Sequence, residues 1–243
     1  MRASFPSTIA EPRIWPTLQI VQERLYAGKS PYEGYEKVIV PGGDYALNSI
    51  LLKNQLTSLI VDHFGGKGPK FMLEVGSFVG AGATGVFGPI VKASGGLLLC
   101  IDTWEGAGDL RLDLKFRELM KVEHGMPNLY KIWMTRVIEA GLIENVFPLT
   151  LPSIVGFRVL ERLAWKVDAI YLDASHDQGE TYVELQLYYD ILEPGGIIFG
   201  DDFEFYPGVK HDVLQFAKCN GLKVDTHLHN TFVIKKPSAL PSK

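Results

Sequence analysis

The sequence predicts a single α/β domain with a doubly wound, mostly parallel sheet of seven strands. Three observations support this fold class. The chain has 243 residues, which suits one such domain with short additions. Hydrophobic residues make up 47% of the sequence, enough for a sizeable core. Short apolar runs alternate with helix-sized segments, an order typical of a parallel sheet with helices on both faces.

The start of the chain is predicted to form an N-terminal extension, residues 1–40, that serves as a lid or as an oligomer contact. One helix is expected within it, over residues 18–26. A Pro-Gly-Gly break at 41–43 ends the extension, so the main domain should span 41–236. The end of the chain, 237–243, is rich in Pro and Ser and is predicted to be a flexible tail.

Five apolar runs in the middle of the chain are predicted to be the parallel strands. A helix over 47–64 precedes them, and helix-sized segments separate them. Two further runs are joined by a short His-Asn turn, which predicts an antiparallel hairpin at the C-terminal edge of the sheet. In chain order the seven runs are 71–75, 97–101, 145–149, 169–172, 197–199, 222–227 and 231–235.

Composition and charge exclude several classes of function. The formal net charge is −4, which argues against a nucleic-acid partner, because phosphate binding needs a basic face. Two cysteines cannot build a disulfide framework. No run approaches the roughly 20 apolar residues of a membrane-spanning helix. Residues 1–11 lack the pattern of a secretory signal, so we expect no membrane association and a cytoplasmic location.

A glycine-rich loop follows the first predicted strand and opens a helix. It reads Glu74-Val-Gly76-Ser-Phe-Val-Gly80-Ala-Gly82. Glycines let the backbone approach a ligand, and helix N-terminal amides then face that ligand. Asp102 ends the next strand, 20 residues after Gly82, where an acid can bind ribose hydroxyls. This order favours an adenosine-type nucleoside site over the simpler interpretation, a tight strand-to-helix turn.

The spacing of the glycines indicates which nucleoside is bound. A dinucleotide site usually has Gly-x-Gly-x-x-Gly, whereas this loop has Gly-x-x-x-Gly-x-Gly. Glu74 would repel a pyrophosphate but would attract a cationic amino group. The loop therefore favours S-adenosylmethionine, which ends in an amino acid and carries no phosphate.

These features resemble the class I S-adenosylmethionine-dependent methyltransferases, which have a Rossmann-like fold. Within that class the chain is similar to small-molecule O-methyltransferases of the methyltransferase-24 and catechol-O-methyltransferase-like groups. The resemblance runs from about 41 to 235 and rests on 74–82, 101–106, 172–177 and 193–202. It implies methyl transfer from S-adenosylmethionine to a hydroxyl of a small molecule.

The resemblance also implies which residues bind the cofactor. The loop residues would line the methionine side, an acid would bind the ribose, and Thr103 or Trp104 with Ser153 would lie on the adenine side. Residues 42–45 loosely match a segment near the methyl donor. The expected cofactor-binding set is Glu74, Gly76, Ser77, Phe78, Gly82, Asp102, Thr103, Trp104 and Ser153.

Three acids end neighbouring strands of the predicted sheet. Asp173 follows the fourth parallel strand, and Asp201 and Asp202 follow the fifth. Carboxylates that converge at one edge repel one another unless a cation neutralises them, and oxygen ligands suit Mg²⁺. The same acids can also cap helices or loops. The matching positions in metal-dependent relatives are metal ligands, so we expect a Mg²⁺ site here.

His176 lies three residues after Asp173, just past the strand end. A neutral imidazole beside a metal-bound hydroxyl is a sound general base, although a lone histidine often has a structural role. Aromatic residues near the site, among them Trp133 and Tyr35, are candidate lids.

Three alternatives stay open at this point. The chain can be a metal-free methyltransferase acting on nitrogen or oxygen, a non-catalytic S-adenosylmethionine-binding protein, or, least in keeping with the glycine spacing, a nicotinamide oxidoreductase. Catechols, sugar hydroxyls and polyols all fit a chelating site, so the acceptor is not identified. The oligomeric state is left open by the sequence, with a homodimer as one candidate and the N-terminal extension as a candidate dimer element.

Overall fold

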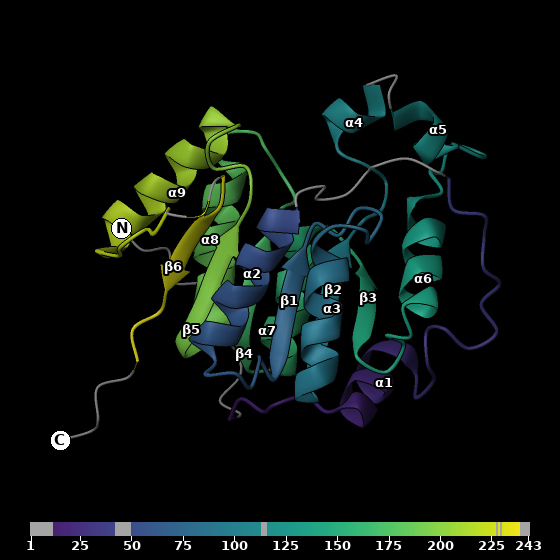
Figure 1. Cartoon of the computed structure of the whole chain (residues 1–243), viewed down its shortest axis with the longest axis horizontal. Helices are drawn as coiled ribbons and strands as arrows, with labels where there is room; N and C mark the ends of the chain where they lie inside the picture. Colours follow the sequence, from purple (N-terminus) through teal and green to yellow (C-terminus); the bar gives the residue numbers. More distant parts are fainter. Residues whose placement is uncertain (1–11, 42–49, 113–115, 227, 229, 239–243) are drawn as a thin grey trace.

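The computed structural model describes residues 12–41, 50–112, 116–226, 228 and 230–238. Its centre is a six-stranded sheet with the order β3-β2-β1-β4-β5-β6 (Figure 1). The first five strands in the chain run parallel, and β6 is antiparallel to β5. The strands are β1 (Phe71–Val75), β2 (Leu97–Asp102), β3 (Val146–Thr150), β4 (Val167–Leu172), β5 (Leu192–Gly200) and β6 (Phe232–Lys235).

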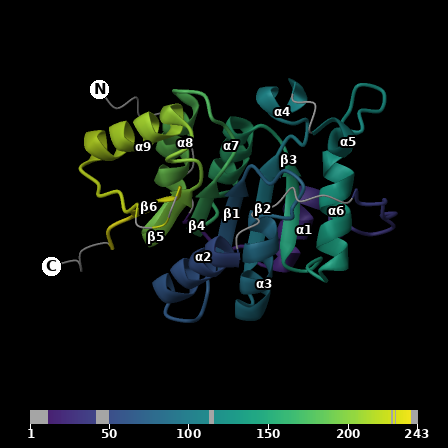
Figure 2. The same cartoon turned by 45° about the horizontal axis from the view of Figure 1, so that its top comes forward.

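Helices cover both faces of the sheet. One face packs against α2, α3 and α6, and the other packs against α1, α7, α8 and α9 (Figures 1 and 2). Two short helices, α4 and α5, lie beyond the carboxyl ends of the strands. The helices are α1 (Leu18–Tyr26), α2 (Ile50–His63), α3 (Ala83–Ser94), α4 (Gly108–Leu112), α5 (Arg117–Met120), α6 (Leu129–Glu139), α7 (Ser153–Leu163), α8 (Glu180–Ile191) and α9 (Pro207–Asn220).

The unbroken apolar runs become strands that are buried on both sides. In β1, Met72 packs into the α2–α3–α6 side of the core, whereas Phe71, Leu73 and Val75 pack into the opposite side. Successive side chains of a strand point to opposite faces, so both faces of a covered parallel strand must be apolar. The charged exception in β1 is Glu74, which is 1% exposed. The predicted α/β, doubly wound fold class is confirmed.

The expected seventh strand, 222–227, is absent from the described part of that segment. Gly221, in the left-handed conformation, ends α9, and only Asp225 pairs with β6. Its amide and carbonyl exchange hydrogen bonds of 2.9 Å with those of Val233. The segment would lie at the outer edge of the sheet, and Lys223, Asp225 and Thr226 give it little apolar surface to bury. The expected hairpin is therefore one strand and an isolated bridge.

The described part of the N-terminal extension contacts β3 and α6. Ile14 forms a bridge with Trp165, just before β4, and the Tyr32 hydroxyl donates to the Val146 carbonyl at 2.6 Å. These contacts place Ile14 and Tyr32 at the amino ends of the strands, whereas the Val38 amide donates to the Thr135 hydroxyl of α6 at 3.0 Å. The lid role and the oligomer contact both stay predictions.

Two further expectations fall outside the described residues. They are the segment 42–45 near the methyl donor and residues 239–243 of the tail. Within the described part of the chain, no helix has the length and apolar character needed to span a bilayer.

Candidate active site

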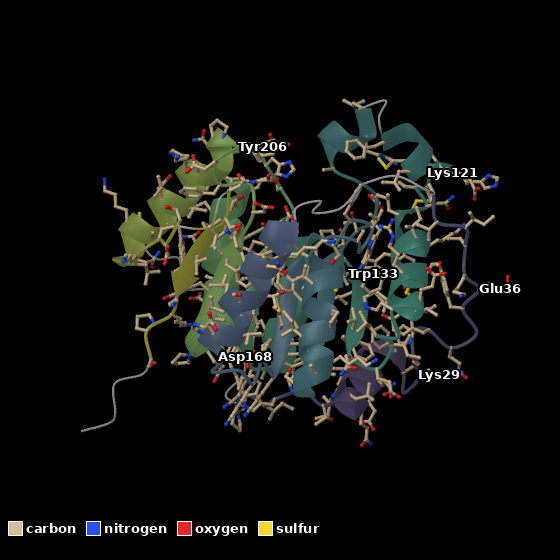
Figure 3. The ribbon with its side chains drawn as sticks, viewed as in Figure 1. Lys29, Glu36, Lys121, Trp133, Asp168 and Tyr206 are labelled. Carbon is tan, nitrogen blue, oxygen red and sulfur yellow. The ribbon has the colours of Figure 1, made fainter. Side chains whose placement is uncertain are left out.

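A cavity of about 770 Å³ opens at the carboxyl ends of the parallel strands. This is the edge at which open α/β sheets bind their ligands. Figure 3 marks the two ends of the sheet, with Asp168 near the amino ends and Tyr206 near the carboxyl ends. The sequence-predicted residues that line the cavity are Glu74, Gly76, Ser77, Phe78, Gly82, Asp102, Thr103, Ser153, Asp173, His176 and Asp202.

The glycine loop packs directly on the end of β4. Gly76 has φ +89°, and a Cβ placed there would lie 2.0 Å from the carbonyl oxygen of Asp173. Any other residue at this position would force the two strand ends apart. Gly82 precedes α3 and has no side chain to cap it, and both Gly82 and Ala83 line the cavity. The loop thus brings its backbone next to the ligand space.

Asp102 joins the two loops that form one wall of the cavity. Its Oδ2 accepts hydrogen bonds of 2.8 Å from the amides of Ser77 and Phe78, and its Oδ1 accepts one of 2.7 Å from the Trp104 amide. Burial raises the pKa of this carboxyl, and the backbone amides of the same loops oppose that rise. Asp102 therefore shapes the cavity as well as lining it, and its contact with ribose stays a prediction.

Glu74 is a buried carboxyl next to the glycine loop. Its Oε2 accepts from the Thr84 hydroxyl at 2.6 Å and from the Cys100 thiol at 3.0 Å. Burial raises the pKa of Glu74 to about 7, although the contacts with Cys100 and Thr84 lower it. A cation placed in the cavity beside this group would favour its ionised form.

Trp104 does not line the cavity, contrary to its predicted place on the adenine side. Its ring packs 5.1 Å from the rings of Tyr130 and Trp133, and it is 2% exposed. Trp133 is fully buried, on the side of α6 that faces the sheet (Figure 3), and so cannot be a lid. Its indole N–H donates to the Thr84 hydroxyl at 3.2 Å. Of the two adenine-side candidates, Thr103 is the one in the cavity wall.

Asp173, His176 and Asp202 each place a ligand atom within 4.8 Å of the other two. His176 Nε2 lies 2.8 Å from Asp202 Oδ2, and the imidazole stacks on the Tyr206 ring at 4.0 Å. Desolvation, followed by the charges of Asp201 and Asp202, raises the pKa of Asp173 well above its ordinary range. Two carboxylates and one imidazole form a donor set that suits a divalent cation.

Asp201 has a different role from the other two predicted ligands. Its Oδ1 accepts from the Asp202 amide at 2.9 Å and from the Asn230 side chain at 2.8 Å. The side-chain oxygen of Asn230 also accepts hydrogen bonds from the amides of Glu204 and Phe205. Asp201 and Asn230 therefore together fix the conformation of the loop after β5. The structure thus adds His176 to Asp173 and Asp202, while Asp201 lies close enough for its charge to raise the pKa of Asp173. The sequence places Asp201 and Asp202 together, but adjacent residues need not point the same way.

The cavity also contains a buried acid that the sequence analysis missed. Glu184, on α8, is 5% exposed and lines the cavity beside Ser153 and Val183. Burial raises its pKa to about 7. A signal was present: Thr181, Glu184 and Tyr188 follow helical spacing among buried positions of α8, which places an acid on the inner face.

The residues of the cavity wall that the structure describes include six acids. They include no lysine or arginine, and His176 is the basic side chain among them. A cationic or neutral ligand suits such walls better than a phosphate does, because like charges repel in a poorly hydrated site. The acids are Glu74, Asp102, Asp173, Glu180, Glu184 and Asp202.

Known structures share this fold. The chain aligns with NovP, an O-methyltransferase, at TM-score 0.57 and 16% identity, covering 81% of this chain and 84% of that one. For a Bacillus cereus O-methyltransferase in complex with S-adenosylhomocysteine, the TM-score is 0.53 at 16% identity, with 89% and 94% covered. For TomG of Streptomyces achromogenes, in complex with S-adenosylmethionine, it is 0.53 at 16% identity, with 81% and 83% covered.

The amino-acid sequence identifies the family directly. No curated protein sequence matches the chain. The model of the methyltransferase domain family matches residues 73–203, more than half of the chain and most of the parallel sheet with its glycine loop and acidic strand ends. The chain therefore belongs to this methyltransferase domain family and has the Rossmann-like fold of the class I S-adenosylmethionine-dependent methyltransferases.

Proposed function

We propose that this protein transfers the methyl group of S-adenosylmethionine to a hydroxyl oxygen of a small molecule. The observation that carries the proposal is one cavity that joins the glycine loop to the Asp173–His176–Asp202 cluster. The loop supplies a site for the methyl donor, and the cluster supplies groups that can activate a hydroxyl. Both lie at the same edge of the sheet, so donor and acceptor can meet there.

The charges of the cavity support S-adenosylmethionine over a dinucleotide. The cofactor carries a sulfonium and an ammonium group, and Glu74 lies on the strand that leads into the glycine loop. A pyrophosphate would meet the same carboxyl and the other acidic walls without a described lysine or arginine to offset them. Electrostatics therefore favours the cationic ligand.

The acidic cluster fits a divalent cation. Asp173 and Asp202 would hold it through carboxylate oxygens, and His176 through a ring nitrogen. A bound cation would lower the pKa of an acceptor hydroxyl, as metals do for water. His176 suits a base role as the alternative to ligating the cation, since a nitrogen bound to the cation has no lone pair left for a proton. In the base role, the carboxylate of Asp202, 2.8 Å from its Nε2, would stabilise the protonated ring.

In the proposed reaction, the acceptor oxygen attacks the methyl carbon as the carbon–sulfur bond breaks. The sulfonium becomes the neutral thioether S-adenosylhomocysteine, and the hydroxyl proton passes to His176 and then to solvent. The chain's main contribution is to align the two reactants and to exclude water between them. No lysine lies among the described cavity residues, so His176 is the best-placed proton acceptor.

The test measures S-adenosylhomocysteine formation from S-adenosylmethionine and a neutral catechol, with Mg²⁺ or with EDTA. We expect Mg²⁺-dependent turnover in the wild type and a large loss in Asp202→Asn and His176→Gln. A histidine that only ligates the cation should regain activity with excess metal, whereas a histidine that accepts the proton should not. Turnover that is equal in EDTA would support the metal-free alternative. Cofactor binding without turnover of a catechol, a sugar or a polyol would support a non-catalytic binder.

A further inference from the structure

The inner face of α8 holds the turn that follows β3. Glu184 and Tyr188 are four residues apart and so lie on one face of the helix. The Tyr188 hydroxyl donates to the Ser153 carbonyl at 2.7 Å. The Glu184 carboxyl contacts the Ser153 side chain, a hydrogen bond that lowers its otherwise raised pKa. Two residues of α8 thus position both the backbone and the hydroxyl of Ser153.

Glu184 has unused capacity to accept hydrogen bonds. A carboxyl group has about four acceptor positions, and the Ser153 hydroxyl accounts for one of them. Within the described residues it takes part in no ion pair, although it is only 5% exposed. The carboxyl oxygens of Glu184 are not among the fully buried atoms that lack a partner, which agrees with their facing the cavity, where water or a ligand can donate to them. Because Glu184 lines the cavity, the ligand can supply these donors.

The order of the strands indicates which part of the cofactor reaches Glu184. Glu74 lies on β1, Asp102 ends β2, and Ser153 follows β3, and the sheet places these strands side by side as β3-β2-β1. A cofactor with its amino-acid end near Glu74 and its ribose near Asp102 therefore extends its base towards Ser153 and Glu184. The base of S-adenosylmethionine carries an exocyclic amino group with two N–H donors.

We propose that Glu184, acting with Ser153, recognises the exocyclic amino group of the cofactor's adenine and determines the base specificity of the site. This inference rests on the proposed function. The carboxyl accepts an N–H of the amino group, and the Ser153 hydroxyl orients the carboxyl. A base with a carbonyl oxygen at that position would place two acceptors against each other, so the site rejects it.

The experiment compares S-adenosylhomocysteine with S-inosylhomocysteine, which has a carbonyl in place of the amino group, by titration calorimetry at a pH above 8, where Glu184, with a pKa of about 7, is ionised. From the contribution of a hydrogen bond to a charged group, the wild type should prefer the adenosine ligand by about 10- to 100-fold. In Glu184→Gln the amide can donate to the carbonyl, so the preference should largely disappear. Ser153→Ala should lose part of it.

The control is Asp190→Asn, which removes a carboxylate from the exposed side of the same helix and should keep the wild-type ratio. Thermal unfolding of each variant establishes that it is folded. If Glu184→Gln and Ser153→Ala bind with the wild-type preference, this inference is overturned while the proposed function stands. If the wild type binds neither nucleoside, the proposed function fails first and the inference with it.

Discussion

Replacing Glu74 with glutamine should remove a loss of stability that the wild type undergoes as the pH rises through about 7. Burial raises the pKa of Glu74 to about 7 from its ordinary value of 4.5. At 1.36 kcal/mol per pH unit, this difference corresponds to about 3 kcal/mol of unfolding free energy. The group is 1% exposed, so solvent screening reduces this value little.

The sign follows from proton binding. Between pH 4.5 and about 7 the folded chain keeps the proton of Glu74 and the unfolded chain releases it. Stability falls with pH wherever the unfolded state binds fewer protons. The contribution of Glu74 is therefore fully present below pH 4.5 and is lost as the pH rises through 7. Glutamine cannot ionise and has no such loss.

The assay is urea unfolding of the wild type and Glu74→Gln from pH 4.5 to pH 8. The unfolding free energy of the variant minus that of the wild type should rise by about 3 kcal/mol across this range. Asp168, with a pKa of about 6, and Glu184 titrate in both proteins and cancel in the difference. Asp190→Asn is the matched control on the surface. Parallel curves for the wild type and Glu74→Gln would show that the pKa of Glu74 is not raised in the folded chain.

Three further predictions test the site and its support. Gly76→Ala should cost at least about 2 kcal/mol of unfolding free energy, because its Cβ would lie 2.0 Å from the Asp173 carbonyl oxygen at a positive φ; urea unfolding within error of the wild type would contradict this. Asp212→Ala should cost about 1–2 kcal/mol, because Asp212 accepts the amides of Gly179 and Tyr182 at 2.6 and 3.2 Å where α8 begins. Thermal melts test this loss, and an unchanged midpoint would speak against it. A phosphate-bearing catechol should be methylated about tenfold or more slowly than its neutral parent, because the cavity walls are acidic; equal rates of S-adenosylhomocysteine formation would refute that charge argument.

The sequence predicts the parallel strands and the glycine loop well because their signals are local. Each strand is a short apolar run, and a strand buried on both faces has no polar alternation to obscure it. The loop and Asp102 are recognisable because backbone approach requires glycine and because the acid follows at the end of the next strand. The glycine loop and Asp102 both line the cavity.

Side-chain direction and edge pairing are less predictable. Asp201 and Asp202 are adjacent, yet Asp202 is the one whose Oδ2 lies 2.8 Å from His176, while Asn230 from a distant loop donates to an oxygen of both carboxylates. Trp104 follows the second strand as an adenine-side residue would, but its ring is buried in an aromatic cluster that includes Trp133. These outcomes depend on contacts between residues far apart in the chain.

The strand predicted over 222–227 is wrong because it, too, depends on contacts between residues far apart in the chain. A strand at the margin of a sheet is stabilised by what packs beside it, and a polar sequence gives no signal of such packing. The burial of Glu184 could be predicted from the sequence, since its helical spacing matches that of buried neighbours. Its place beside Ser153, however, depends on how α8 packs against α7.

The most direct test of the account is a calorimetric titration of the purified chain with S-adenosylhomocysteine, followed by NAD⁺. We expect saturable binding of one S-adenosylhomocysteine per chain, loss of that binding in Gly76→Ala that remains folded, and no binding of NAD⁺. Absence of heat with S-adenosylhomocysteine, or equal binding of NAD⁺, would contradict the claim that the glycine loop and its acidic cavity form a methyl-donor site.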